Sequence, residues 1–184
     1  MALTASGTKQ GFYGCSFKGF QDTLYVISGT QYFKNCNVVG ATDFIFGGAS
    51  SWFESCTISV TAKGYITANK RDASSDTNSW FVFNNANILA TVSGLPGKVY
   101  LGRPWRNLAR VQYQNSKMTD IIAPIGWTTM STATNPNPVF LEYKNTGAGS
   151  DTAKRGNFGK VATSAVAITT VLGSDYKSWI DAAY

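Results

Sequence analysis

The sequence predicts an all-β fold in which short strands wind into a parallel β-helix, and three observations support this prediction. Eighteen Gly, 14% aromatic residues and many Thr, Val, Ile and Asn favour strands and turns. A short pattern recurs along the chain at a period in the low twenties, which is typical of solenoid proteins. No amphipathic helix of useful length lies between the copies, so alternating strands and helices are excluded.

The copies of the pattern share an aromatic residue, a small residue and an apolar residue at fixed positions. They lie at residues 12–17, 33–38, 53–58, 83–88, 113–118 and, in part, 139–143. We interpret each copy as one coil, with like positions stacked about 4.8 Å apart. The longer spacings then hold loops at residues 69–78 and 91–97. Residues 1–184 are expected to form one β-helix domain, with a C-terminal tail from about residue 160 to residue 184.

Two columns of the repeat predict the interior of the helix. Phe12, Phe33 and Phe53 indicate a stack of aromatic rings in the core. The column of small residues consists of Cys15, Cys36, Cys56, Ala86 and Ser116. Buried free thiols are the favoured interpretation, because the cysteine count is odd and the chain has no His to complete a metal site. One disulfide stays open as an alternative, since neighbouring coils bring Cα atoms within disulfide range.

The composition also excludes several classes of function. The absence of His removes Ser-His-Asp and Cys-His triads and His-ligated zinc. No apolar run approaches the length of a membrane span, and the first residues do not read as a signal peptide. The net charge of +6 suits a polyanionic partner. Because the 16 Lys and Arg are scattered and no recognition motif is present, an acidic polysaccharide fits this charge as well as nucleic acid does.

The alignment of the copies places two acidic residues in one column. Asp22 and Asp43 each lie seven residues after the cysteine of their copy, and the next coil holds Lys63 at that position. Carboxyls on successive coils would lie one strand spacing apart, so that one stays ionised while the pKa of the other rises. Such a pair can supply a nucleophile and an acid at neutral pH. Taken singly, each aspartate is also typical of a surface turn.

Three longer motifs resemble, in order and spacing, the signature motifs of pectin methylesterases. They are GFQDTLY at residues 19–25, GATDFIFG at 40–47 and YLGRPW at 100–105. The stretch LGSDYKSW at residues 172–179 is similar to the fungal branch of this family. The resemblance implies a right-handed parallel β-helix that hydrolyses the methyl esters of polygalacturonate, giving methanol and acidic pectin, with no metal and no other cofactor.

The resemblance implies a role for each matching residue. Asp43 would be the nucleophile that forms an acyl-enzyme. Asp22 would protonate the departing methoxide and then act as the base towards water. Arg103 would hold Asp43 ionised through charge-assisted hydrogen bonds, and Gln21 would donate its amide to the tetrahedral oxyanion. From the residues alone, Gln21 is equally well a polar residue on a strand.

The resemblance further implies a groove in which aromatic rings pack on the faces of sugars. The matching positions are Trp105, Trp127, Tyr25 and Phe46. Aromatic residues are more often part of a core, which is the alternative at each of these positions. Lys63 and Arg71 are further candidates for contacts to galacturonate carboxylates, because of their charge and their column.

The resemblance runs along the whole chain but covers little more than the C-terminal half of the family's catalytic domain. In register, the family's N-terminal coils and a second oxyanion glutamine would precede Met1. The expected partners are methyl-esterified pectin and a proteinaceous pectinesterase inhibitor, with no nucleic acid and no membrane. A secreted, extracellular location follows from the family alone.

Three other functions stay open at this point. A catalytically weak β-helix module would bind pectin or a partner protein without turnover. A pectin-cleaving lyase or glycosidase on the same general fold would shorten the polysaccharide, because paired carboxylates also serve glycoside hydrolysis. Nucleic-acid binding would give a salt-dependent gel shift. The three motifs favour the esterase over each of these.

Overall fold

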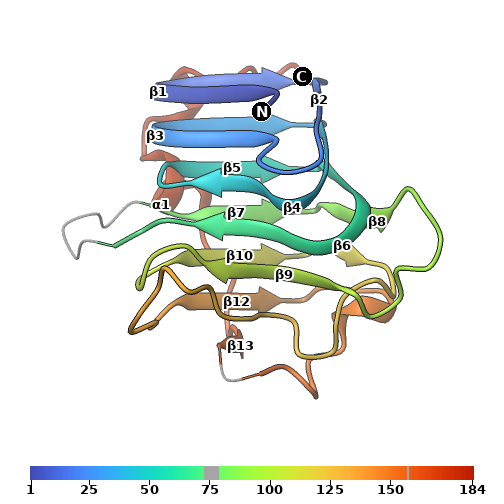
Figure 1. The fold of residues 1–184 in the computed structure, drawn as a ribbon. Helices are drawn as coiled ribbons and strands as arrows, with labels where there is room; N and C mark the ends of the chain where they lie inside the picture. Colours follow the sequence, from blue (N-terminus) through green and yellow to red (C-terminus); the bar gives the residue numbers. More distant parts are fainter. Residues whose placement is uncertain (73–78, 157) are drawn as a thin grey trace.

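The computed structural model describes residues 1–72, 79–156 and 158–184, so residues 73–78 of the predicted loop at 69–78 lie outside the described part. In the described part, one parallel sheet winds through stacked coils, and the predicted parallel β-helix is confirmed (Figure 1). Its strands are β1 Leu3–Tyr13, β2 Ser16–Lys18, β3 Leu24–Lys34, β4 Asn37–Gly47, β5 Ser50–Glu54, β6 Thr57–Asn69, β7 Phe81–Asn84, β8 Asn87–Ala90, β9 Val99–Pro104, β10 Arg110–Gln114, β11 Lys117–Met118, β12 Val139–Tyr143 and β13 Gly159–Val161.

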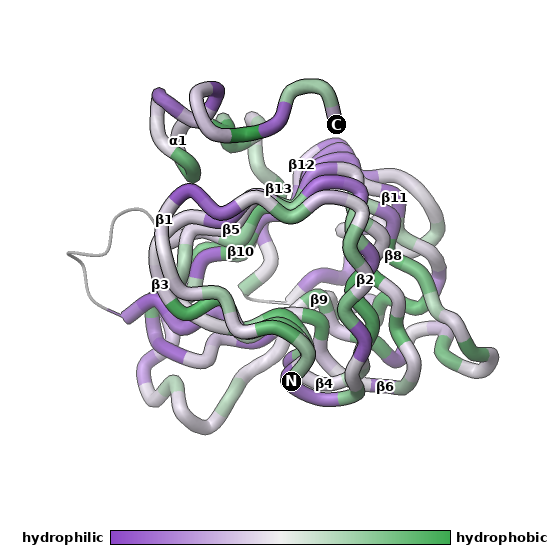
Figure 2. The backbone as a smooth tube through the Cα atoms, turned by 90° about the horizontal axis from the view of Figure 1, so that it is seen from above, coloured by the Kyte–Doolittle hydropathy of each residue, from purple (hydrophilic) through white to green (hydrophobic). Residues whose placement is uncertain are grey.

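The coils present three faces, each a stack of parallel strands (Figure 2). The first face consists of the C-terminal halves of β1 and β3 with β5, β7, β10, β12 and β13. The second consists of β2, the N-terminal halves of β4 and β6, β8 and β11. The third joins the N-terminal halves of β1 and β3 to the C-terminal halves of β4 and β6 and to β9. The predicted loop at 91–97 is confirmed, between β8 and β9.

A left-handed backbone recurs at the corner between the first and second faces. The residues there are Gly14, Asn35, Ser55, Asn85 and Asn115, with φ between 51° and 60°. Gly and Asn adopt this conformation at lower cost than other residues. The Gly or Asn before the small residue of most copies is therefore the local signal that bends each coil.

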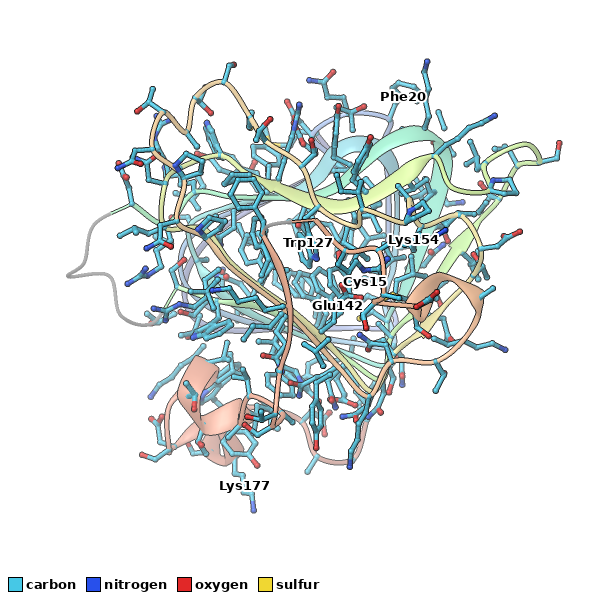
Figure 3. All side chains as sticks on the ribbon, turned by 90° about the horizontal axis from the view of Figure 1, so that it is seen from below. Cys15, Phe20, Trp127, Glu142, Lys154 and Lys177 are labelled. Carbon is cyan, nitrogen blue, oxygen red and sulfur yellow. The ribbon has the colours of Figure 1, made fainter. Side chains whose placement is uncertain are left out.

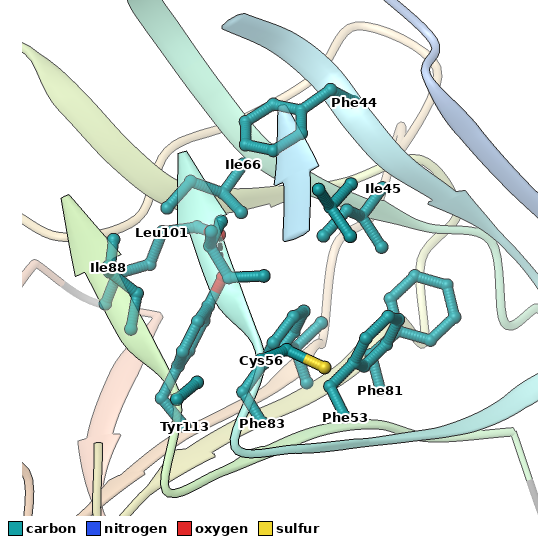
Figure 4. Close-up of a cluster of buried hydrophobic side chains, with 14 of the residues drawn as sticks. Phe44, Ile45, Phe53, Cys56, Ile66, Phe81, Phe83, Ile88, Leu101 and Tyr113 are labelled. Carbon is teal, nitrogen blue, oxygen red and sulfur yellow. Dashed lines mark hydrogen bonds between the residues drawn. The ribbon is translucent and has the colours of Figure 1, made fainter. Parts of the chain in front are cut away.

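The predicted core column is confirmed as a ladder of parallel rings. Phe12, Phe33, Phe53, Phe83 and Tyr113 stack in that order, with neighbouring ring centroids 4.5 to 4.8 Å apart. Figure 4 shows three of these rings packed beside Cys56 and aliphatic residues from the other faces. Because each ring packs on the ring of the adjacent coil, the ladder joins the coils into one core.

The column of small residues also lies as predicted. Cys36 and Cys56 are buried, Cys15 is half-buried, and all three cysteines are free. The thiol of Cys36 donates to the Phe12 carbonyl at 3.4 Å, and that of Cys56 donates to the Phe33 carbonyl at 3.5 Å. The interpretation as free thiols is confirmed, and the alternative of a disulfide is wrong for this structure.

In the last coil, a charged residue takes the place of the aromatic one. Glu142 pairs in register with Tyr113 and is 3% exposed. Its carboxylate accepts hydrogen bonds from Arg155, at 2.7 Å from Nε and 2.9 Å from Nη2, and from Nε1 of Trp127 at 3.3 Å. Figure 3 shows Trp127 and Glu142 inside the coil at this end. A buried ion pair therefore ends the aromatic ladder.

The C-terminal segment returns along the outside of the first face (Figure 1). Its short helix α1, Ile168–Leu172, buries Val171 and Leu172 in a second apolar cluster that includes Trp52 of β5. The side-chain amide of Gln114 exchanges two hydrogen bonds with the backbone of Val166, at 2.9 and 3.2 Å. The 3-10 helices η1, Ala148–Ser150, and η2, Tyr176–Ser178, are the other short helices described. No helix in the described residues is long and apolar enough to cross a membrane.

Candidate functional site

Asp22 and Asp43 lie on neighbouring coils, as their common column predicts. A parallel bridge pairs Gln21 with Thr42, and the backbone N–H of Asp22 donates to the Thr42 carbonyl at 3.2 Å. Asp22 precedes β3, and Asp43 lies within β4, where that strand turns from the second face to the third. Both aspartates have a left-handed backbone, with φ of 54° and 48°. This conformation is uncommon outside Gly, Asn and Asp, and it occurs at both carboxyls.

Arg103 of β9 forms an ion pair with the Asp43 carboxylate. Its Nε donates to Oδ1 at 2.9 Å and its Nη2 donates to Oδ2 at 2.6 Å, in a bidentate pair. Burial works against the charge of the guanidinium, but the Asp43 carboxylate outweighs burial and raises the pKa of Arg103. Asp43 is 6% exposed. The structure therefore pairs a buried carboxylate with a cation that keeps its charge.

Asp22 meets a different environment. Burial, and secondly the negative charge of Asp43, raise the pKa of Asp22 above its ordinary value of 3.8. The two carboxyls share a cavity of about 210 Å³. Its lining residues are Gln21, Asp22, Asp43, Phe46, Ala68, Trp105 and Met130. One carboxyl is thus paired with a cation while the pKa of the other is raised, and the Gln21 amide lies beside them.

Three of the four predicted aromatic residues gather beside these carboxyls. Tyr25 and Phe46 stack with their centroids 4.4 Å apart and their planes 3° apart. The Trp105 ring lies 5.9 Å from Phe46 and 6.4 Å from Tyr25. All three are only half-buried. Their partly exposed rings form an apolar wall next to the polar groups, which is a common build for a small-molecule site.

The fourth aromatic residue, Trp127, lies in the core and does not line the cavity of the two carboxyls, so its role in a substrate groove stays a prediction. Trp127 is 1% exposed and stacks on Phe140 at 4.2 Å. Its indole N–H donates to Glu142. The physical reason is that Glu142 takes the place of the next core ring, and Trp127 from a connecting segment packs beside Tyr113, with ring centroids 5.8 Å apart.

Neither basic candidate lines the cavity of the two carboxyls. Lys63 does not share their column, because β6 has extra residues where it pairs with β4, so that Thr42 lies opposite Tyr65. Lys63 is exposed at this irregularity. Arg71 is 8% exposed, and its Nη1 donates to the Leu108 carbonyl at 3.3 Å. The strand register therefore corrects the column predicted for Lys63, whereas contacts of Lys63 and Arg71 to galacturonate carboxylates stay predictions.

Three residues at the site were missed from the sequence. Ala68 lies in register between Phe46 and Arg103, and its small side chain leaves the cavity open. The Tyr65 ring lies under the Arg103 guanidinium. Both would have been found from the pairing of β6, but the irregularity in that strand hides the pairing in the sequence. Met130 comes from a segment outside the repeat, and no sequence signal indicates it.

Comparisons with known proteins agree with the fold and with the motifs. The Pectinesterase family model matches residues 1–172. The "Probable pectinesterase A" of Neosartorya fischeri is 52% identical over 185 residues, and the "Pectinesterase A" of Emericella nidulans is 52% identical over 186 residues. Each match covers 100% of this chain and 56% of the relative. The chain thus spans little more than half the length of these relatives.

Solved structures give the same result. The crystal structure of the pectin methylesterase from Aspergillus niger superposes with a TM-score of 0.95 and 52% identity, covering 100% of this chain and 60% of that one. The pectin methylesterase from carrot superposes with a TM-score of 0.78 and 35% identity, covering 84% of this chain and 52% of that one. The coiled architecture is therefore shared with these proteins.

Proposed function

This chain belongs to the pectinesterase family, and from that premise we propose that it hydrolyses the methyl esters of pectin through an acyl-enzyme on Asp43. The observation that carries the proposal is the pair of carboxyls in one cavity, of which Asp43 is held by Arg103 at 2.9 and 2.6 Å and Asp22 has a raised pKa. On this difference we assign Asp43 as the nucleophile and Asp22 as the acid in the same pocket.

In the first half of the reaction, an Asp43 oxygen attacks the carbonyl carbon of the ester and forms a tetrahedral intermediate. The negative charge passes to the carbonyl oxygen, to which the Gln21 amide donates a hydrogen bond. The bond to the methoxy oxygen then breaks, and the Asp22 carboxyl gives its proton to that oxygen, so that methanol leaves. The galacturonyl group remains attached to Asp43 as an acyl-enzyme.

In the second half, Asp22 is a carboxylate and takes a proton from an incoming water molecule. The resulting hydroxide attacks the acyl carbon, and the bond to Asp43 breaks. The products are a galacturonic acid unit in the polymer, the free Asp43 carboxylate and a protonated Asp22. The site then has its starting charges. Trp105, Phe46 and Tyr25 are proposed to pack on the sugar rings that flank the reacting ester.

The proposal extends to partners and location. The substrate is methyl-esterified pectin, and the net charge of +6 suits a polymer that becomes more acidic as it is hydrolysed. A proteinaceous pectinesterase inhibitor is proposed as a partner on the basis of the family. An extracellular location is proposed on the same basis, since the polymer is a component of cell walls.

Methanol release from highly methylated pectin tests the proposal. We expect the 184-residue chain to release methanol and the Asp43→Asn variant to release none above background, because an amide does not replace the carboxylate nucleophile. Asp120→Asn, which changes an exposed acid between β11 and the next coil, is the matched control and should keep the rate.

Equal rates for Asp43→Asn and the unchanged chain would overturn the assignment of the nucleophile. A folded chain that releases no methanol but is retained on de-esterified pectin would overturn the esterase and support a pectin-binding module. Circular dichroism of each protein shows whether it is folded.

A further inference from the structure

The guanidinium of Arg103 makes two kinds of contact at once. Its edge, through Nε and Nη2, donates to the two oxygens of Asp43 at 2.9 and 2.6 Å. Its central carbon lies over the Tyr65 ring, 3.9 Å from the centroid. Because the donors of a guanidinium lie in its plane, these contacts use different parts of the group and do not compete. A cation at this distance from an aromatic face is attracted by the ring.

The strand order explains why the long Arg103 side chain needs neighbours that fix its orientation. Asp43 lies on β4 and Arg103 on β9, with β6 between them. The arginine side chain therefore crosses two strand spacings, roughly 10 Å, to reach the carboxylate. Along this path β6 provides Ala68, which leaves room for the side chain, and Tyr65, whose ring lies beneath the guanidinium.

The place of Tyr65 is itself set by the irregularity in β6. The pairing of β6 with β4 runs from Val60 opposite Gly40 to Tyr65 opposite Thr42, so β6 contributes extra residues over this stretch. Tyr65 therefore comes to lie beside the residue that precedes Asp43. The ring is half-buried and stacks on Tyr100 of β9 at 5.3 Å, which restricts its rotation.

We propose that Tyr65 is a positioning residue, whose ring holds the Arg103 guanidinium in the orientation that binds both oxygens of Asp43. The inference rests on the proposed function, because the aligned carboxylate is the nucleophile there. A free arginine side chain of this length has many rotamers, and each wrong one removes one or both bonds to Asp43. The ring acts through Arg103 and does not line the cavity of the two carboxyls.

Two variants of Tyr65 and one control test this role in the full 184-residue chain. Tyr65→Phe keeps the ring, and Tyr65→Leu removes it. Tyr143→Leu is the matched control, because Tyr143 is another half-buried tyrosine, on β12 of the first face. We expect Tyr65→Leu to lower kcat for methanol release by about tenfold with little change in KM. Tyr65→Phe and Tyr143→Leu should keep kcat near that of the unchanged chain.

A second measurement does not depend on catalysis. The Nε–H of Arg103, observed by ¹⁵N NMR, should be protected from exchange with water in the unchanged chain and in Tyr65→Phe, and exposed to exchange in Tyr65→Leu. A merely structural role of Tyr65 would lower the melting temperature without this selective loss. Should Tyr65→Leu fail to fold, Tyr65→Val carries the same expectation, since its β-branched side chain suits a strand.

The two proposals fail in different ways. If the unchanged chain releases no methanol, the proposed function fails, while the Nε–H measurement still decides the role of Tyr65. If Tyr65→Leu keeps both kcat and the protected Nε–H, the positioning role is overturned. An equal loss of kcat in Tyr143→Leu would overturn it as well, because the effect would then not be specific to the ring beneath Arg103.

Discussion

At the scale of single residues, Asp22 and Asp43 differ because each carboxyl meets different neighbours. Asp43 receives both donors of the Arg103 fork, whereas Asp22 faces burial and a neighbouring negative charge. Two identical side chains in adjacent coils thereby acquire different properties, which is the condition for assigning one as acid and one as nucleophile. The repeat brings the two carboxyls together, and the hydrogen bonds from Arg103 to Asp43 give them different electrostatic environments.

The raised pKa of Asp22 gives a prediction at this scale. In Asp43→Asn, the pKa of Asp22 should fall from its raised value, because the negative charge of Asp43 is removed and Arg103 loses its carboxylate partner. Titration of the Asp22 carboxyl carbon by ¹³C NMR measures this change. An unchanged pKa in the variant would mean that burial alone raises it. Asp120→Asn serves as the control and should leave the titration of Asp22 unaltered.

At the scale of elements, the close packing of β9 against β6 determines the position of the Arg103 backbone. Gly102 faces Thr67, and a Cβ added to Gly102 would meet Thr67 Oγ1 and would lie 3.2 Å from the Trp127 ring. These neighbours are buried and cannot move far. β9 can therefore come this close to β6 only with a glycine next to the arginine.

We expect Gly102→Ala to destabilise the protein by about 1–3 kcal/mol, the usual cost of overpacking. It should also lower the rate of methanol release, because the displaced strand carries Arg103. Gly48→Ala is the control, since its Cβ would lie 3.3 Å from the flexible Lys70 side chain and its backbone is not left-handed. Urea unfolding and initial rates measure the two effects, and equal results for both alanine variants would contradict the prediction.

The aromatic ladder gives a second prediction for elements. Phe53 stacks between two rings at 4.7 and 4.5 Å and is fully buried, whereas Phe12 stacks on Phe33 alone and is half-buried. Phe53→Ala should therefore cost about 3–5 kcal/mol in the free energy of unfolding, and Phe12→Ala clearly less. Urea denaturation of the two variants tests this order. Equal losses would show that the rings do not act through burial between coils.

At the scale of the whole molecule, a network of buried polar groups closes the C-terminal end of the core. Near the C-terminal end, Glu142 stands in the aromatic column and is paired with Arg155, whose side chain also donates to backbone carbonyls of Pro124 and Gly149. Trp127 donates to the same glutamate. This network joins the last coil to two connecting segments.

Breaking the pair should be costly, because a buried charge would be left without a partner. We expect Arg155→Met to lower the free energy of unfolding by about 3–5 kcal/mol, and Glu142→Gln in the same chain to restore part of this loss. Thermal and urea unfolding measure both. Lys9→Met removes an exposed ion pair with Asp175 and should leave the melting temperature unchanged. If Lys9→Met destabilised the protein as much as Arg155→Met, a special role for the buried pair would be contradicted.

The sequence by itself determined the parts of this protein that depend on contacts one coil apart. The spacing of the copies predicted the parallel β-helix and the core rings, because like positions of a solenoid stack directly. The same reasoning placed Asp22 beside Asp43. The odd number of cysteines and the absence of His predicted the free thiols. The motif resemblance predicted Arg103 as the partner of Asp43 and placed Trp105, Phe46 and Tyr25 near the carboxyls.

Only the tertiary structure decided the features that depend on irregularities and on segments outside the repeat. The extra residues in β6 move Lys63 away from the acids and bring Tyr65 beneath Arg103. Trp127 enters the core because a connecting segment places it next to Tyr113 and Phe140. A single column of the alignment contains neither effect, since both depend on how several coils and loops pack at the same time.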